Sequence, residues 1–151
     1  MSEGIKIIVN NKKAFHEYEI MDKLVAGLVL LGTEVKSLRL GKANLNEAWI
    51  DLKNHEAFLV SSHIGHYTHG NIANHLETRP RKLLLKHKEI LKLEESMFQK
   101  GLTIIPLKLF FRKSLVKVEI ALARGKKHYD KRESAKKHSA ERDMQRALNK
   151  R

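Results

Sequence analysis

Short apolar segments separated by turn-forming residues make up most of the chain before its last quarter. β-Branched residues predict a strand over residues 6–9, and the pair Asn10-Asn11 ends it. A second extended, apolar-rich segment covers residues 18–31. Gly27 within that segment marks a bulge or a place where another part of the chain approaches closely. This succession of apolar runs and turns is typical of a β domain.

Two hairpins are predicted further along the chain. Asn54-His55 separates residues 49–53 from residues 56–61, as a tight turn would. Residues 112–115 join two longer strands, 102–111 and 116–123. Alternation within these strands places one apolar set on a common face, namely Leu107, Leu109 and Phe111, followed by Val116, Val118, Ile120 and Leu122.

Helices are predicted at two places. Thr33 can cap a short helix that runs to Arg39 and stops before Gly41. A longer helical segment, with a break near Leu93, is predicted from Pro80 to Gly101, because proline suits a first helical turn. Apolar residues spaced seven apart form two rows on one helical face: Leu83, Ile90 and Met97, and Leu84, Leu91 and Phe98.

These elements predict a mainly β fold, a small β-barrel with flanking helices. The pattern alone does not separate a closed barrel from an open α+β sheet. A length of 151 residues suffices for one domain. We assign that domain to residues 1–123 and treat residues 124–151 as a tail.

The tail holds a disproportionate share of the positive charge. Of the formal net charge of +13, residues 124–151 carry eleven basic and four acidic residues, against nineteen and thirteen in residues 1–123. A cationic segment with few apolar residues needs a polyanion to lie against, so the charge pattern points to nucleic acid.

Other classes of protein fit the composition poorly. The chain has no cysteine, which excludes disulfides and thiolate metal sites. Its longest apolar run, residues 25–31, is too short to cross a bilayer, and its first residues lack the pattern of a signal peptide. We therefore expect a cytoplasmic, monomeric protein with no membrane partner, no cofactor and no metal.

Within the tail, Gly125 is expected to act as a hinge before a dense contact motif. The motif offers cations to phosphates and one aromatic ring to a base, and consists of Lys126, Lys127, Tyr129, Asp130, Lys131 and Arg132. Asp130 and Glu133 have the spacing of a capping box, which predicts a helix beyond them. Like charges oppose that helix, so we expect disorder in the free protein and helix on a partner.

Five segments of the chain, in the same order, resemble the SmpB (small protein B) family. They are NKKAFHEYEI (residues 11–20), GTEVKSLRLGKANL (32–45), RPRKLLLKHKEI (79–90), IIPLKLFF (104–111) and KVEIALARGKKHYDKRE (117–133). Five long motifs in register are far more specific than any single short pattern.

The resemblance implies an oligonucleotide-binding (OB-fold-like) barrel and a non-catalytic function. Such a protein binds the tRNA-like domain of transfer-messenger RNA (tmRNA) and delivers it to stalled ribosomes for trans-translation. Its tail occupies the decoding centre, against 16S rRNA, and the empty mRNA channel. Elongation factor Tu is implied as an indirect partner, through the RNA.

The residues of the first motifs have chemistry that suits RNA. Asn11, Lys12 and Lys13 lie on the predicted turn, where two cations and an amide can reach phosphates and base edges, and the His16 ring can stack on an unpaired base. A basic turn of this size is also typical of a solvated loop. The resemblance favours the RNA-binding interpretation.

Further candidates follow along the barrel domain. Lys36, Arg39 and Lys42 are spaced three apart, which places them along one side of the short helix, as a phosphate-contacting edge or an ordinary solvated face. We expect Glu34 nearby to organise cations, or to act as a charge at a helix N-terminus, rather than to bind RNA.

The start of the predicted long helix offers a second basic cluster. Arg79, Arg81 and Lys82 could bind phosphate there, beside outward-pointing N–H groups. Leu84 fits a core position by pattern, while the resemblance implies an apolar residue near the RNA. Lys117 begins the final strand and is expected on the RNA face.

One departure from the family pattern affects these contacts. The family commonly has Tyr-Glu-Ala-Gly where this chain has Leu24-Val25-Ala26-Gly27. The resemblance implies that the glutamate binds RNA, and Val25 cannot supply that polar contact.

Two other functions remain open from the residues alone. A general single-strand-binding module or ribosomal protein would bind unrelated RNAs equally and lose affinity steeply with salt. A metal-dependent enzyme would use a histidine-rich loop, which holds His63, His66, His69 and His75. That loop lacks a matching set of carboxylates or cysteines, so we favour a structural or adventitious explanation for its histidines. No nucleophile–base pairing and no phosphate-cradling glycine loop indicates an enzyme.

Overall fold

The computed structural model describes residues 4–68 and 74–126 of the chain. The strands in these residues are β1 (Lys6–Asn10), β2 (Tyr18–Leu28), β3 (Ala43–Asn44), β4 (Trp49–Lys53), β5 (Glu56–Val60), β6 (His63–Ile64), β7 (Arg81–Leu84), β8 (Thr103–Arg112) and β9 (Leu115–Gly125). The helices are α1 (Lys12–Glu17), α2 (Gly32–Arg39) and α3 (His87–Lys100). The described part of the chain is therefore mainly β, as predicted.

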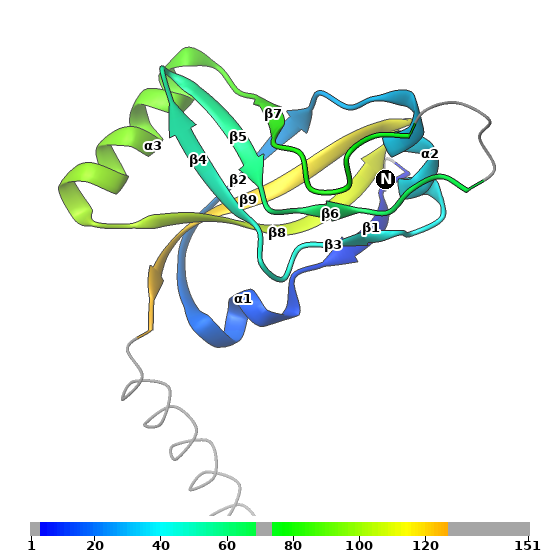
Figure 1. The fold of residues 1–151 in the computed structure, drawn as a ribbon. Helices are drawn as coiled ribbons and strands as arrows, with labels where there is room; N and C mark the ends of the chain where they lie inside the picture. Colours follow the sequence, from blue (N-terminus) through cyan, green and yellow to red (C-terminus); the bar gives the residue numbers. More distant parts are fainter. Residues whose placement is uncertain (1–3, 69–73, 127–151) are drawn as a thin grey trace, which may run out of the picture.

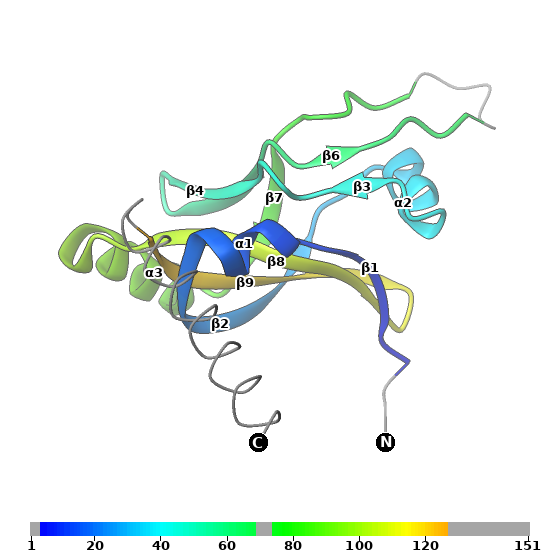
Figure 2. The same cartoon turned by 90° about the horizontal axis from the view of Figure 1, so that it is seen from below.

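Seven strands form one antiparallel sheet in the order β1-β8-β9-β2-β7-β5-β4, and β3 pairs with β6 separately. The sheet folds over into two layers, with β1, β8, β9 and β2 in one layer and the β4–β5 hairpin with β3 and β6 in the other (Figures 1 and 2). Register shifts in β1, β2 and β8 help this curvature, because a bulge bends its strand. The fold brings β4 beside β8.

The main hydrophobic core lies between the two layers. Strands β8 and β9 supply Ile104, Leu109, Val118 and Ile120, all fully buried, and α3 contributes Leu93. A smaller cluster lies on the opposite face of β8 and β9, where Ala14 of α1 packs on Ile105, Leu107, Ala121 and Ala123. Figure 2 shows α1 lying over β8. The outer face of the sheet is therefore covered by α1 at one end.

Both predicted hairpins are present and have the turn geometry that matches strand twist. Asn54 and His55 have φ angles of 52° and 61°, and Lys113 and Ser114 have 50° and 70°. Two successive positive φ values mark a type I′ turn, the preferred two-residue hairpin connection. The close approach at Gly27 is also confirmed, because a Cβ there would lie 3.3 Å from Leu84 Cδ1.

The predicted helix from Pro80 is wrong in its first part. Residues 81–84 form β7, which pairs with β2 and β5, and α3 begins only at His87 and continues without a break to Lys100. Burial along β7 alternates, with Leu83 buried and Leu84 exposed. The seven-residue row of Leu84, Leu91 and Phe98 is consequently not a core row: these side chains are 57, 44 and 81% exposed.

A second correction concerns the face of Leu107. The register shifts between Pro106 and Lys108, so the alternation predicted through Leu107 and Leu109 is interrupted. Leu107 packs under α1, whereas Leu109 lies in the main core. One extra residue in a strand reverses the side on which the following side chains point.

Candidate nucleic-acid interface

The uncovered end of the outer sheet face brings together three of the predicted RNA-binding residues. Gly27 on β2 lies opposite Leu84 on β7 and also opposite Lys117 on β9. Lys82 lies two residues before Leu84 and is exposed on the same side. The Lys117 ammonium would be 3.6 Å from a Cβ at Gly27, so the absence of a side chain there leaves room for both neighbours.

The pairing row continues to an aromatic residue that is only 4% exposed, so its ring is not presented to a ligand. Phe110 on β8 lies opposite Lys117, and the Lys108 ammonium is 5.6 Å from the centre of its ring. We call the surface formed by the accessible residues the outer sheet face and define it by Gly27, Lys82, Leu84 and Lys117. Its row across β9, β2 and β7 depends on pairings between distant segments, which periodicity cannot reveal.

The departure at Val25 lies next to this row. Val25 is exposed and lies directly opposite Glu119 on β9. Residues opposite one another in an antiparallel pair share a face of the sheet. A carboxylate is therefore present on the outer face at the level of Val25, although on the neighbouring strand.

Residues predicted on the first basic turn lie on and around α1 instead. Lys12, Lys13 and His16 are exposed on this helix. Lys12 and Lys13 line a hollow of about 430 Å³ between α1 and β3, together with Asn44 and Asn46. The hydrogen bond from Lys13 Nζ to Glu47 (3.1 Å), together with the charges of Glu17 and Glu47, raises the pKa of Lys13.

Asn11 has a structural position and is not the surface ligand that was predicted. It is buried at the start of α1, where its Nδ2 donates to the Pro106 carbonyl oxygen at 2.8 Å. Its backbone N–H donates to the Leu107 carbonyl oxygen at 2.7 Å. Asn11 therefore attaches α1 to the bulged part of β8, which leaves Lys12, Lys13 and His16 as the accessible groups.

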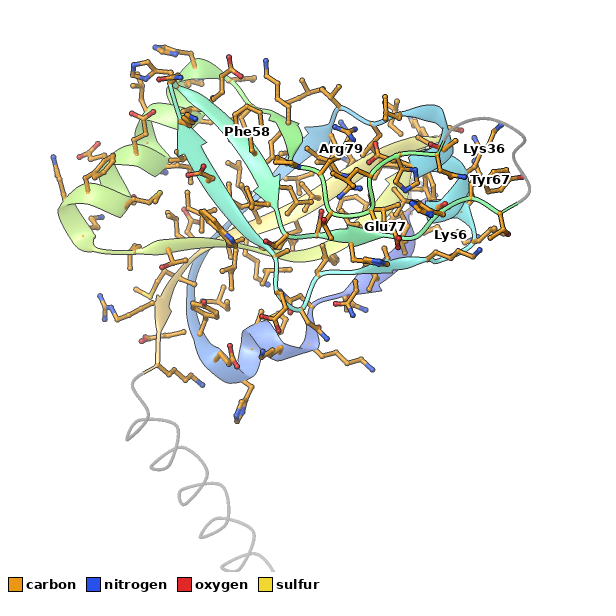
Figure 3. The ribbon with its side chains drawn as sticks, in the orientation of Figure 1. Lys6, Lys36, Phe58, Tyr67, Glu77 and Arg79 are labelled. Atoms are coloured by element: carbon orange, nitrogen blue, oxygen red, sulfur yellow. The ribbon has the colours of Figure 1, made fainter. Side chains whose placement is uncertain are left out.

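The second basic group surrounds α2. Lys36 and Arg39 are exposed on the helix, but Lys42 follows Gly41, whose φ of 73° ends the helical path. The three cations are therefore not one helical row. The Lys36 ammonium lies 5.5 Å from the centre of the Tyr67 ring, and Figure 3 shows these two side chains beside each other at the α2 end of the molecule.

A buried ion-pair network fixes α2 against the segment that leads into β7. Both Arg79 and Arg81 donate to the Glu34 carboxylate, with Nε···Oε2 distances of 3.0 and 2.6 Å. The backbone N–H of Leu31 donates to Glu34 Oε1 at 2.8 Å. The predicted role of Glu34, as an organiser of cations and a charge at a helix N-terminus, is confirmed in this geometry.

Burial opposes the charged form of Glu34, but the hydrogen bonds outweigh it. Burial by itself would raise the pKa of this carboxyl. Hydrogen bonds from Arg79, the Leu31 N–H and Arg81 instead hold the pKa below its ordinary value. Burial is also the largest cause that lowers the pKa of the Arg81 guanidinium, opposed by its hydrogen bond and charge interaction with Glu34.

Arg81 is consequently a correction to the predicted RNA-binding set. Its side chain is fully buried, and it lies in a strand rather than at a helix N-terminus. Its remaining donors reach Ser62 Oγ and the carbonyl oxygens of Ser62, Leu76 and Glu77. A guanidinium whose donors are all engaged inside the protein is not presented to a phosphate.

Comparison with known families and proteins identifies the family of this chain. The model of the SmpB family, described as SmpB protein, matches residues 8–150. The chain belongs to the SmpB family. This confirms the resemblance seen in the five sequence motifs, and the family is one of RNA-binding proteins rather than enzymes.

Individual relatives agree with the family match. The SsrA-binding protein of Geotalea uraniireducens (strain Rf4) is 56% identical over 151 residues, covering all of this chain and 99% of the relative. That of Pelobacter propionicus is 54% identical over 145 residues, covering 96% and 95%. A solved SmpB-family chain, described as "tmRNA-SmpB: a journey to the center of the bacterial ribosome", has a TM-score of 0.69 and 41% identity over 84% of this chain and 93% of its own.

The histidine-rich loop of this SmpB-family chain has structural contacts. His75 is buried, with Nδ1 2.9 Å from Thr33 Oγ1 and Nε2 2.8 Å from the Ile64 carbonyl oxygen. His63 Nε2 lies 2.6 Å from Glu77 Oε2. Within the described residues, which exclude His69, no group of three or more His, Cys, Asp or Glu residues is arranged to hold a metal ion.

The tail predictions fall mostly beyond the part of the chain that the structure describes. Gly125 is the last residue of β9, opposite Tyr18, and the Lys126 N–H donates to the Glu17 carbonyl oxygen at 2.9 Å. The strand therefore continues two residues past the predicted domain boundary. Outside the described residues lie the predicted helix and the rest of the contact motif, namely Lys127, Tyr129, Asp130, Lys131 and Arg132.

None of the helices in residues 4–68 and 74–126 is long and apolar enough to cross a membrane.

Proposed function

We propose that this chain binds the tRNA-like domain of tmRNA and delivers it to stalled ribosomes for trans-translation. The observation that carries the proposal is the family match over residues 8–150, which spans both the sheet domain and the basic tail. Relatives named SsrA-binding protein cover nearly the whole chain, and the solved tmRNA-SmpB chain supports ribosome association. The expected partners are therefore tmRNA, the ribosome and, through the RNA, elongation factor Tu.

The sheet domain would hold the RNA with cations of the outer sheet face, α1 and α2. Lys82 and Lys117 would contact phosphates from the outer sheet face, with Leu84 against a sugar or base between them. The helices α1 and α2 would extend this contact through Lys12, Lys13, His16, Lys36, Arg39 and Lys42. We further assign the folded-over sheet to the OB type, because it presents a curved antiparallel surface suited to oligonucleotides.

The tail would detect an empty mRNA channel of the ribosome by entering it. Its contact motif, Lys126, Lys127, Tyr129, Asp130, Lys131 and Arg132, would lie at the decoding centre against 16S rRNA. A message that fills the channel would exclude the tail and so confine the reaction to stalled ribosomes. The charge of residues 124–151, eleven basic against four acidic side chains, supports this placement along RNA.

Charge reversal on the outer sheet face tests the RNA-binding proposal. In the variant Lys82→Glu/Lys117→Glu we expect affinity for the tRNA-like domain to fall about tenfold or more. The slope of log affinity against log salt should shrink by about two, because two phosphate contacts are lost. Filter binding or fluorescence anisotropy across a salt series measures both quantities.

The matched control reverses an exposed lysine away from this row. Lys113 lies in the β8–β9 turn, so Lys113→Glu should bind the tRNA-like domain nearly as well as the unchanged protein. An unrelated RNA hairpin of equal length serves as competitor. Equal competition by that hairpin would favour a general RNA-binding protein, and equal loss in both variants would contradict the proposed face.

A further inference from the structure

A groove runs between the first half of β2 and helix α3, on the other side of the sheet from the proposed RNA face. It consists of two adjoining hollows of about 460 and 540 Å³, which share Asp22, Lys92 and Leu122. Its floor is formed by Leu24, Leu93 and Leu122, which belong to or pack on the main core. We call it the α3 groove. The outer sheet face points away from that core, so the two surfaces are separate.

Positive charge lines the rim of the α3 groove. Five cations border it, namely Lys23, Lys88, Lys92, Lys100 and Arg124, against two carboxylates, Asp22 and Glu89. Both carboxylates already accept a backbone N–H, from Lys23 at 2.9 Å and from Lys86 at 2.7 Å. Among the described residues, none of the five cations forms an ion pair. The five cations and two carboxylates leave the groove lining with three more positive than negative charges.

The apolar part of the groove argues against RNA as its occupant. Met21 is 49% exposed and, with Leu24, gives the floor accessible hydrocarbon surface. Among the described residues that line it, none is a Phe, Tyr or Trp on which a base could stack. Proteins that bind single-stranded nucleic acid use such rings together with their cations. The aliphatic floor and the cationic rim are instead complementary to a ligand that has an apolar side flanked by acidic groups.

We propose that the α3 groove binds an acidic amphipathic segment of another protein. From Lys88 to Lys100 the helix rises roughly 18 Å, which accommodates about three turns of a docked helix. Apolar residues of that helix at i, i+4 and i+7 would cover Met21 and Leu24, with Asp or Glu beside the lysines. Charge complementarity also excludes two occupants from this chain. Residues 127–151 are themselves cationic, and a second copy would bring a further net charge of +13.

A designed peptide tests the proposal with the full-length protein. The probe is a fluorescein-labelled peptide of about twelve residues with leucine at i, i+4 and i+7 and glutamate at most other positions. Its control is a scrambled peptide of identical charge, which has no apolar side. Both peptides carry the same charge, so the basic tail attracts them equally. A difference in anisotropy between them therefore reports binding in the α3 groove. We expect the amphipathic peptide to bind more tightly.

Two further measurements locate the site. The double variant Lys88→Glu/Lys92→Glu should lower the affinity for the amphipathic peptide about tenfold, whereas Lys113→Glu should leave that affinity unchanged. Amide shifts in an NMR titration should concentrate in residues 21–24 and 88–100. The proposal is wrong if the scrambled peptide binds equally well or if the shifts lie elsewhere. It is also wrong if a labelled uridine oligonucleotide loses affinity in the double variant while the peptide does not. Affinity for the tRNA-like domain, which tests the proposed function separately, should stay unchanged in this variant.

Discussion

Glu34→Gln is expected to destabilise the folded domain by about 3–5 kcal/mol, a large part of the stability of a domain this size. The substitution keeps the shape of the side chain but removes its charge. Arg79 and Arg81 would then share no carboxylate, and Arg81 is fully buried. A buried guanidinium without its counter-charge is the main cost. Urea unfolding at neutral pH, followed by circular dichroism, measures the loss as a lower midpoint at unchanged slope.

The same pair gives a pH dependence with a defined sign. The pKa of Glu34 is lowered in the folded state, so its stabilising contribution is fully present above the unfolded value of about 4.3. That contribution disappears as the pH falls through the lower folded pKa. The difference in stability between the unchanged protein and Glu34→Gln should therefore be constant near neutral pH and shrink below about pH 4.

Glu47→Gln supplies the matched control for this prediction. Glu47 also forms an ion pair, with Lys13 at 3.1 Å, but its side chain is 78% exposed. Solvent screens such pairs, so its urea midpoint should hardly move. Equal midpoints for Glu34→Gln and the unchanged protein would show that the buried network does not hold α2 to the β7 segment.

The hairpins could be predicted from sequence because their signals are local. Asn54-His55 and residues 112–115 lie between segments of matching length, and the turn and its two strands are adjacent in the chain. The end of the short helix α2 was likewise predictable from Gly41. The predicted cap at Thr33 is wrong, because the helix begins at Gly32 after the N-cap residue Leu31 and the Thr33 hydroxyl pairs with His75. In each of these elements, chain neighbours determine the conformation.

Strand β7 could not be predicted because its partners are distant. Residues 81–84 have apolar residues at helical spacing with those of α3, and Pro80 precedes them as it would a helix. Their conformation is decided by pairing with β2 and β5 and by burial of Arg81 on Glu34, forty-seven residues earlier. Tertiary contacts override local preference here. The RNA-binding prediction for Arg81 is wrong for the same reason, since it rested on the false helix start.

The sequence supplied candidate residues for the site but not the surface on which they lie. Lys82, Leu84 and Lys117 gather on one face only because β7, β2 and β9 are adjacent in the sheet. Phe110 pairs with Lys117 in the same row, but it is buried and so does not join this surface. The prediction that Asn11 contacts RNA was based on its residue type, because an amide suits a base edge. Burial and the hydrogen bond to Pro106 give Asn11 a structural role instead.

Truncation after Lys126 is expected to abolish tagging of stalled translation products while leaving affinity for the tRNA-like domain nearly unchanged. The variant keeps all of β9 and the hydrogen bond from Lys126 to Glu17. It removes nine basic and four acidic residues, together with Tyr129 of the contact motif. Some loss of affinity at low salt should vanish at physiological salt, because long-range attraction by the tail is screened.

The two activities must be measured on the same preparation to separate binding from delivery. Anisotropy with the labelled tRNA-like domain reports binding, and a reconstituted trans-translation reaction on a message without a stop codon reports tagging. A second variant, Tyr129→Ala, keeps every charge of the tail and removes only the ring that would stack on a base, so it should reduce tagging without altering the salt dependence of RNA binding. Normal tagging by the truncated protein would exclude a role for the tail in sensing the mRNA channel. If the truncated protein also loses affinity for the tRNA-like domain, the tail contributes to tmRNA binding. The sheet domain would then be insufficient to bind the RNA by itself.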